Sequence, residues 1–272
     1  MNILDELAAK ARQRVVAADQ KRPLADVAQA AQFLAQTSPV PSFYQALQNA
    51  SLAYICEVKR ASPSKGMIAP DFPYRQIALD YQNAGAAAIS CLTEPFYFKG
   101  RNQYLQEIAR TVTIPVLRKD FIVDPYMIYE ARRLGAAAIL LIAGLLSVEQ
   151  LAEYRQLAES LGMDALVEAH NESELQRALK SGARIVGVNN RNLNDFTVDP
   201  HTSVQLRGLV PDNVLFVSES GIKNAAAIQE LKDNRVNGVL IGETLMRSPD
   251  KAQMLQKLNG GPLVEPSLRG VD

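Results

Sequence analysis

The sequence predicts an α/β protein built as a (β/α)₈ TIM barrel with an N-terminal helical extension. Eight short apolar runs alternate with amphipathic helical patterns along most of the 272 residues. Such alternation implies parallel pairing, because parallel neighbours need a crossover connection, and eight units fit a barrel of roughly 250 residues. An open doubly wound sheet is the alternative. It usually carries a glycine-rich fingerprint after its first strand, and residues 61–66 (ASPSKG) do not match one.

The expected elements follow one another at regular intervals. The strands are predicted at 54–59, 87–92, 114–119, 137–142, 165–168, 185–189, 214–219 and 236–241. The helices are predicted at 72–84, 103–110, 126–134, 148–161, 172–180, 201–208 and 225–231, with a short run at 244–247. Gly85, Gly135 and Gly182 each supply a left-handed helix C-cap before a strand.

The chain is predicted to form a single domain in three parts. Residues 1–50 keep apolar side chains at helical spacing and form the extension, residues 51–258 form the barrel, and residues 259–272 form a flexible tail. The extension has two alternatives. It plugs the bottom of the barrel, or it reaches the mouth, where residues 42–44 and the loop 62–66 close over a substrate.

Composition argues against several functions. The 29 basic and 29 acidic residues balance, which is not the footprint of a nucleic-acid-binding protein. The start carries Asp5 and Glu6, unlike a secretory signal, and the longest apolar run, at 136–146, is too short for a membrane span of roughly 20 residues. Cys56 and Cys91 fit buried thiols in a reducing cytoplasm. No histidine and cysteine spacing suggests a metal, so no metal or other cofactor is expected.

Polar residues at the strand ends predict an active site. The two-residue period of a strand turns Glu57 and Lys59 to the same inward face, where unpaired charges are costly. The same period turns four more polar side chains inward on later strands: Lys119, Glu168, Asn189 and Glu219. A structural ion pair explains one such pair. The whole set favours chemistry at the carboxyl-terminal mouth, where this fold places its active sites.

The loops after the last two strands predict a phosphate site. Ser220-Gly221 follow the seventh strand, and Gly242-Glu243 follow the eighth and open a helical run. Backbone amides there suit an anion. The side chain of Glu243 is expected to turn outward, because its charge repels a phosphate.

Three other features have plainer expectations. Arg118 faces away from the pocket by parity and is predicted to pair with a helix carboxylate. His170 is predicted to be an ordinary loop or helix-start residue. The aromatic run 96–98 forms either a minor core or a lid over the substrate.

Four segments resemble the indole-3-glycerol-phosphate synthase family of tryptophan biosynthesis. They are residues 57–66 (EVKRASPSKG), 115–122 (PVLRKDFI), 188–193 (VNNRNL) and 218–222 (SESGI), and the match extends from the N-terminal extension to residue 258. The resemblance implies a carbon–carbon lyase. Such an enzyme cyclises 1-(2-carboxyphenylamino)-1-deoxyribulose 5-phosphate by general acid/base catalysis, with loss of carbon dioxide and water.

The resemblance also implies a role for each site residue. Lys119 is the general acid of ring closure, Glu168 is an acid/base group near the same oxygen, and Glu57 and Lys59 serve later proton transfers. The substrate is contacted by Ser62, Phe121, Leu140, Asn189, Arg191 and Glu219, with Arg191 and Ser62 on the anthranilate carboxylate and Phe121 and Leu140 against the ring. The phosphate is bound by Ser220, Gly221, Gly242 and Glu243, although some relatives have serine at position 243. Lys59 is expected to lower the pKa of Lys119.

Two other functions stay open on the residues alone. One is another phosphate-binding barrel enzyme, either an isomerase of the neighbouring pathway step or a Schiff-base aldolase that uses Lys119. The other is a binding barrel without catalysis. The expected partner is the phosphosugar-anthranilate substrate, with weak contact with tryptophan-pathway enzymes and none with nucleic acid or membrane.

Overall fold

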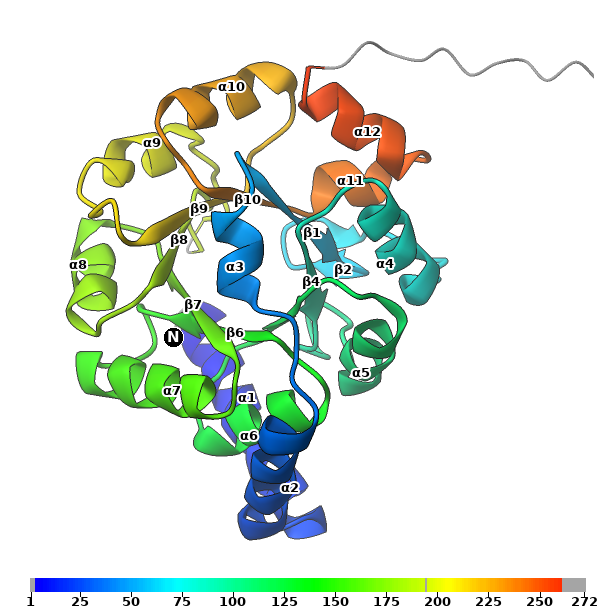
Figure 1. Ribbon diagram of the computed structural model, residues 1–272, viewed down its shortest axis with the longest axis vertical. Coiled ribbons are helices and arrows are strands. Elements are labelled where there is room, and N and C mark those ends of the chain that lie inside the picture. The colour runs from blue at the N-terminus through cyan, green and yellow to red at the C-terminus, as the bar shows by residue number, and fades with distance from the viewer. Residues whose placement is uncertain (1–2, 194, 261–272) are drawn as a thin grey trace, which may run out of the picture.

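The computed structural model of the chain describes residues 3–193 and 195–260, and in these residues eight parallel strands close into a barrel (Figure 1). The order around the barrel is β1-β10-β9-β8-β7-β6-β5-β4, so each strand pairs with its neighbours in the chain and the last pairs with the first. The strands are β1 (Ala53–Val58), β4 (Ala88–Leu92), β5 (Val116–Lys119), β6 (Ala138–Ile142), β7 (Asp164–Ala169), β8 (Ile185–Asn189), β9 (Leu215–Glu219) and β10 (Gly238–Ile241). The predicted (β/α)₈ barrel is confirmed.

Helices surround the barrel and connect its strands (Figure 1). They are α4 (Tyr74–Asn83), α5 (Asn102–Thr111), α6 (Pro125–Arg133), α7 (Val148–Ser160), α8 (Glu172–Lys180), α9 (His201–Arg207), α10 (Ala225–Asp233), α11 (Glu243–Arg247) and α12 (Lys251–Leu258). Gly85, Gly135 and Gly182 have φ values of 91°, 89° and 78°, as their predicted C-cap role requires. Helix α12 and the hairpin of β2 (Ala61–Ser62) and β3 (Gly66–Met67) after β1 were not predicted.

The N-terminal extension contacts both ends of the barrel. Its helices are α1 (Ile3–Lys21), α2 (Leu24–Thr37) and α3 (Phe43–Gln48), and α3 was not predicted. Figure 1 is viewed from the end that α3 covers, with α1 lying behind the barrel. The backbone N–H of Tyr44 donates to Asp164, the first residue of β7, at 2.8 Å. Residues 42–44 therefore lie at the bottom, which agrees with the first alternative for the extension and not with the second.

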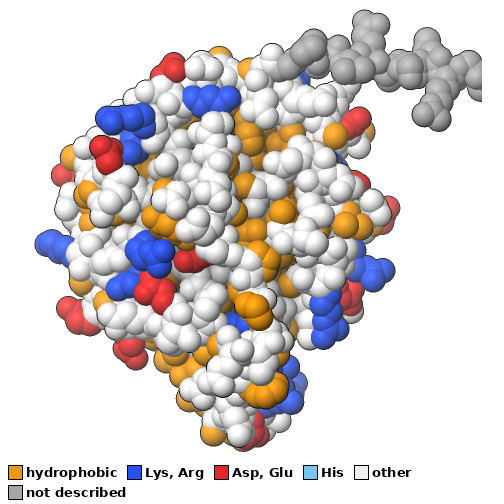
Figure 2. All heavy atoms as spheres, viewed as in Figure 1, with side chains coloured by type: hydrophobic (Ala, Val, Ile, Leu, Met, Phe, Trp, Pro, Cys, Tyr) orange, Lys and Arg blue, Asp and Glu red, His pale blue; other side chains and the backbone are white. Residues whose placement is uncertain are grey.

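Helix α2 packs outside the barrel against α6. The Arg132 guanidinium on α6 donates to the carbonyl groups of Leu34 at 2.7 Å and Ser38 at 2.5 Å, which caps the end of α2. The protruding end formed by α1 and α2 shows hydrophobic side chains in Figure 2, and Phe33 is 62% exposed. Around the same face, basic and acidic side chains are interspersed (Figure 2).

Two expectations concern the periphery. No helix in the described part of the chain is long and apolar enough to cross a membrane. Of the predicted flexible tail, residues 261–272 lie outside the described residues. Asn259, where that tail was expected to begin, accepts a hydrogen bond from the Tyr54 hydroxyl on β1 at 2.7 Å, which attaches Asn259 to the barrel.

Candidate active site

A cavity of about 500 Å³ opens at the carboxyl ends of the barrel strands. All the residues that the sequence analysis selected line it: Glu57, Lys59, Ser62, Lys119, Phe121, Leu140, Glu168, Asn189, Arg191, Glu219, Ser220, Gly221, Gly242 and Glu243. Most of them converge because they lie near the end of a parallel strand or in the loop after it, and parallel strands end on one side of the barrel. The cavity is also lined by Phe98 and by Ile3, Leu4 and Leu7 of α1, which were not selected.

Lys119 lies at the centre of a cluster of carboxylates. Its Nζ is 3.0 Å from Oε2 of Glu168 and 3.5 Å from Oε2 of Glu219, while Lys59 pairs with Glu57 on β1. Burial lowers the pKa of Lys119, but the charges of the three carboxylates outweigh burial and raise the pKa above its ordinary value. The expected lowering by Lys59 is therefore wrong. Lys119 is held as an ammonium ion.

The two buried carboxyl groups beside Lys119 differ in protonation. Burial raises the pKa of Glu168, but Lys119 and His170 outweigh burial and hold it well below its ordinary value. Burial raises the pKa of Glu219 to about 8, and the nearby charge of Glu168 adds to the rise, although the charge of Lys119 opposes it. Glu219 thus holds a proton near neutral pH while Glu168 is ionised, as expected when carboxyl groups share one site.

His170 lies in the loop just before α8, as predicted, and it contacts Glu168 directly. Its Nε2 is 3.2 Å from Oε1 of Glu168, and its Nδ1 is 3.0 Å from Oε2 of Glu174 on α8. Burial lowers the pKa of His170, but the two carboxylates outweigh burial and raise it to about 10. A signal was present in the sequence, because His170 follows Glu168 by two residues and precedes Glu174 by four.

Two glycines leave room for the carboxyl groups. A side chain at Gly187 on β8 would collide with Glu219, and one at Gly242 would collide with Glu57 and Lys59. Glycine in a strand or at its end allows such close approach. Gly242 was selected as a phosphate residue, but the space requirement at Gly187 was not foreseen, since it depends on a neighbouring strand.

The other polar end of the cavity suits an anion. Ser220 and Gly221 both have left-handed backbone, with φ of 69° and 83°, and the backbone N–H groups of Gly221 and Ile222 donate to no described residue. Exposed amides in such a turn attract anions. The Glu243 carboxylate pairs with Arg247 at 3.1 Å on the same helix, and both residues line the cavity, so its expected outward turn stays a prediction.

An aromatic wall faces this polar end. The Phe98 and Phe121 rings are 6.3 Å apart at an interplanar angle of 39°. The Glu94 carboxylate accepts the backbone N–H groups of residues 96–98 at 2.7–2.9 Å, which fixes the loop that carries Phe98. Tyr97 donates its hydroxyl to Glu6 of α1 at 2.7 Å. The aromatic run therefore serves partly as cavity wall and partly as a contact for α1.

Arg118 faces away from the cavity, as predicted, whereas Arg191 lines it. Arg118 points out of the barrel and pairs with Glu130 of α6 at 2.8 Å, as predicted. Arg191 holds its loop by donating its backbone N–H to Asn189 at 3.0 Å and its Nη1 to the Phe196 carbonyl at 3.2 Å. In the part of the chain that the structure describes, no group of three or more His, Cys, Asp or Glu side chains is arranged to hold a metal ion.

The fold and the cavity define a class: (β/α)₈ barrel enzymes that act on anionic substrates by proton transfer. Comparison with known proteins is more specific. Residues 4–258 match the family model described as indole-3-glycerol phosphate synthase. The chain is 51% identical over 258 residues to the indole-3-glycerol phosphate synthase of Ruminiclostridium cellulolyticum, covering 95% of this chain and 99% of the relative. It is 53% identical over 256 residues to that of Endomicrobium trichonymphae, covering 94% and 99%.

The chain belongs to the indole-3-glycerol phosphate synthase family. It is therefore a carboxy-lyase of tryptophan biosynthesis. It cyclises 1-(2-carboxyphenylamino)-1-deoxyribulose 5-phosphate to indole-3-glycerol phosphate with loss of carbon dioxide and water. Solved structures of lower identity show the fold alone. A tryptophan synthase α-subunit mutant from Pyrococcus furiosus aligns with a TM-score of 0.58 at 15% identity, covering 77% of this chain and 97% of that one.

Proposed function

We propose that the substrate lies across the cavity with its two anionic groups at separate places. The phosphate binds the backbone amides of the Ser220-Gly221 and Gly242-Glu243 turns. The anthranilate ring lies against Phe98, Phe121 and Leu140, and its carboxylate meets Arg191 and Ser62. The free amides at the first place and the ring pair at the second support this orientation. The reacting carbonyl then lies near Lys119.

Lys119 is the general acid of ring closure in this proposal. The aromatic carbon that bears the carboxylate attacks the ketose carbonyl carbon, and the Lys119 ammonium donates a proton to the carbonyl oxygen as the new carbon–carbon bond forms. Glu168, which accepts a hydrogen bond from Lys119 at 3.0 Å, stabilises the ammonium before transfer, and afterwards it takes up a proton from solvent and passes it to the neutral Lys119 amine. The bond to the carboxylate then breaks, and carbon dioxide leaves.

The later steps need one acid and one base. The new hydroxyl group takes a proton and leaves as water, and a proton is removed from the adjacent carbon to complete the indole ring. Glu57 and Lys59 form an ion pair on the wall next to Glu219 and supply these transfers. Asn189 and the protonated Glu219 hydrogen-bond to substrate hydroxyl groups.

The single observation that carries this proposal is the position of the Lys119 Nζ, 3.0 Å from Glu168 and 3.5 Å from Glu219 in the cavity. An ammonium ion among carboxylates carries the proton that a general acid must donate but cannot attack a carbonyl, because the amine nucleophile of a Schiff-base aldolase must be neutral. The raised pKa of Lys119 therefore favours the acid over the aldolase alternative. Borohydride added with substrate is expected to trap no adduct on the enzyme.

The direct test is to incubate the protein with the carboxyphenylamino substrate and to follow indole fluorescence. We expect product with no added metal or organic cofactor, and equal rates with and without a chelator. Activity that is lost on chelation and returns with a divalent ion would contradict this. A binding barrel without catalysis would give no fluorescence change in either condition.

We also propose that the enzyme works in the cytoplasm, free of membrane and nucleic acid. The buried, unpaired thiols of Cys56 and Cys91 support a reducing compartment. Weak contact with other enzymes of tryptophan biosynthesis rests on the family resemblance alone. Sedimentation of mixtures with those enzymes is the test of that contact.

A further inference from the structure

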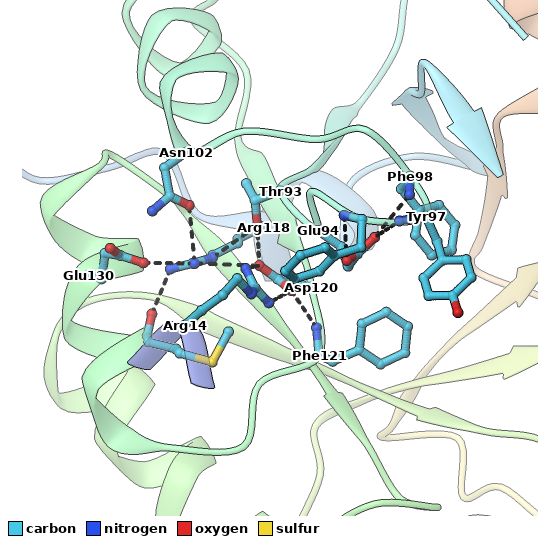
Figure 3. A network of polar contacts seen from close by, with 12 residues as sticks. Arg14, Thr93, Glu94, Tyr97, Phe98, Asn102, Arg118, Asp120, Phe121 and Glu130 are labelled. Carbon is cyan, nitrogen blue, oxygen red and sulfur yellow. Dashed lines mark hydrogen bonds and ion pairs between the residues drawn. The ribbon is translucent and has the colours of Figure 1, made fainter. Parts of the chain in front are cut away.

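A buried ionic network fastens α1 to the end of β5 (Figure 3). The Arg14 guanidinium donates to both oxygens of the Asp120 carboxylate, from Nη1 to Oδ2 at 3.0 Å and from Nη2 to Oδ1 at 2.6 Å. The Asp120 side chain is fully buried, and that of Arg14 is 23% exposed. A bidentate Arg–carboxylate pair fixes orientation as well as distance, which a lysine cannot reproduce.

The other contacts of Asp120 tie it to the neighbouring strand end. Thr93 Oγ1 donates to Oδ2 at 2.5 Å, and the backbone N–H of Phe121 donates to Oδ1 at 2.8 Å. Thr93 also donates its backbone N–H to the Lys119 carbonyl at 3.1 Å. Asp120 therefore anchors the short segment that carries Lys119 on one side and Phe121 on the other, and Figure 3 shows its contacts with Thr93 and Phe121.

The face of α1 that carries Arg14 also reaches the cavity. Leu7, which lines the cavity, precedes Arg14 by seven residues, so the two side chains lie two turns apart on one face. A second attachment, from the Tyr97 hydroxyl to Glu6, holds the same helix to the loop after β4. Helix α1 thus bridges the ends of β4 and β5, while Arg14 itself is not among the residues that line the cavity.

We propose that Arg14 is a positioning residue for ring closure. By holding Asp120 it fixes the end of β5, so that the Lys119 ammonium stays between Glu168 and Glu219 and the Phe121 ring stays at the cavity wall. The inference rests on the acid role proposed for Lys119. Small displacements of a catalytic group lower turnover strongly, because rate depends on alignment of the reacting atoms.

The charges in the network agree with this arrangement. Burial alone raises the pKa of Asp120, but Arg14, followed by Arg118 and Thr93, lowers it to about 2. Without Arg14, the nearest remaining cation is Arg118, whose Nη2 lies 3.5 Å from Oδ2 and is already bound to Glu130. The Asp120 carboxylate would then turn to find new partners, and the chain on either side of it would move.

The test compares Arg14→Met with Arg12→Met, a control on the exposed side of the same helix. Both proteins are assayed at a temperature at which circular dichroism shows them folded. We expect Arg14→Met to lower kcat about tenfold with a smaller change in KM, and Arg12→Met to leave both unchanged. Arg14→Lys keeps the charge without the two-pronged contact, and we expect it to restore only part of kcat.

Asp120→Asn and the double variant Arg14→Met/Asp120→Asn complete a cycle. If Arg14 acts through Asp120, the double variant loses no more kcat than the worse single variant. Arg14→Met that melts at a lower temperature but keeps kcat within about twofold would show a merely structural contact. If Arg14→Met does not fold, Arg14→Lys gives the test instead. A kcat equal to that of the wild type in Arg14→Lys would contradict the proposal, because this variant lacks the bidentate contact with Asp120. If Lys119 is not the general acid, Lys119→Met retains turnover. That result separates failure of the role proposed for Lys119 from failure of the role proposed for Arg14.

Discussion

The two ends of this barrel are closed by the same N-terminal extension in different ways. At the bottom, Phe43 and Leu47 of α3 are fully buried against the strand starts. At the mouth, α1 leaves a cavity of about 500 Å³ whose wall carries buried charges, among them Glu168 and Glu219. One end consists of close packing, and the other keeps groups that packing alone would disfavour.

This difference separates what stabilises the fold from what performs the reaction. Apolar burial at the bottom stabilises the folded state without chemical constraint. Ionisable groups at the mouth are costly to bury. Their neighbours shift their pKa values, and such shifts are typical of groups that transfer protons in an active site. Substitutions at the bottom should therefore change stability, and those at the mouth should change turnover.

The largest expected effect is the loss of the acid at the mouth. Lys119→Met should lower kcat by about 10²–10⁴-fold, the range that a general acid usually contributes. KM should change much less, because the phosphate and carboxylate contacts come from other loops. Steady-state kinetics by indole fluorescence measures both constants. The control is Lys180→Met, an exposed lysine at the end of α8.

A Lys119→Met protein with normal kcat and a raised KM would contradict the assignment of Lys119 to chemistry. It would make Lys119 a binding residue and leave the proton donor to another group.

At the bottom, Leu47→Ala should lower the free energy of unfolding by about 2–5 kcal/mol, because a fully buried leucine leaves a cavity. Chemical denaturation measures this loss, and kcat at 25 °C should stay the same. Gln48→Ala, an exposed neighbour on α3, is the control and should be neutral. A loss of kcat in folded Leu47→Ala would show that the two ends are coupled through the barrel.

The sequence was sufficient for the barrel and for most of its mouth. Strand–helix alternation is a long-range pattern, and the two-residue period of each strand indicates which side chains face inward, as with Glu57 and Lys59. Helix α3 was missed because six residues are too few for helical periodicity to be detected. The sign of the Lys119 pKa shift was wrong because it depends on which charges lie closest in space, and the nearest carboxylate is 49 residues away.

A smaller effect is expected at His170, which contacts Glu168 at the mouth and whose contribution to stability depends on pH. The folded-state pKa of His170 is raised to about 10, so the charged histidine stabilises the fold fully below about pH 6.5. That contribution is lost as pH rises toward 10. His170→Gln should therefore cost about 1.5–3 kcal/mol at pH 6, as charged hydrogen bonds do, and little at pH 10.

Urea unfolding of wild type and His170→Gln at pH 6, 8 and 10 measures this trend. The only other histidine, His201, has a side chain 63% exposed beside Glu230, so His201→Gln is the matched control and should show almost no difference. A cost for His170→Gln that is independent of pH would mean that His170 acts through packing and not through its charge.

The smallest expected change compares one glycine at each end. An alanine at Gly187 would place its methyl group against Glu219 at the mouth, whereas an alanine at Gly238 would meet Leu47, Ala53 and Val217 only at ordinary contact distances of 3.4–3.5 Å. Overpacking by one methyl group costs about 1–3 kcal/mol, and here we expect Glu219 to move away from Lys119 to relieve it. A loss of about 1.4 kcal/mol in the alignment of Lys119 corresponds to a tenfold change in rate, so Gly187→Ala should lower kcat about tenfold. Gly238→Ala should keep kcat and unfold at the wild-type urea concentration or above. Equal kcat in the two variants would mean that the position of Glu219 does not matter to turnover, and the contrast between the two ends would then rest on Lys119 and its other neighbours.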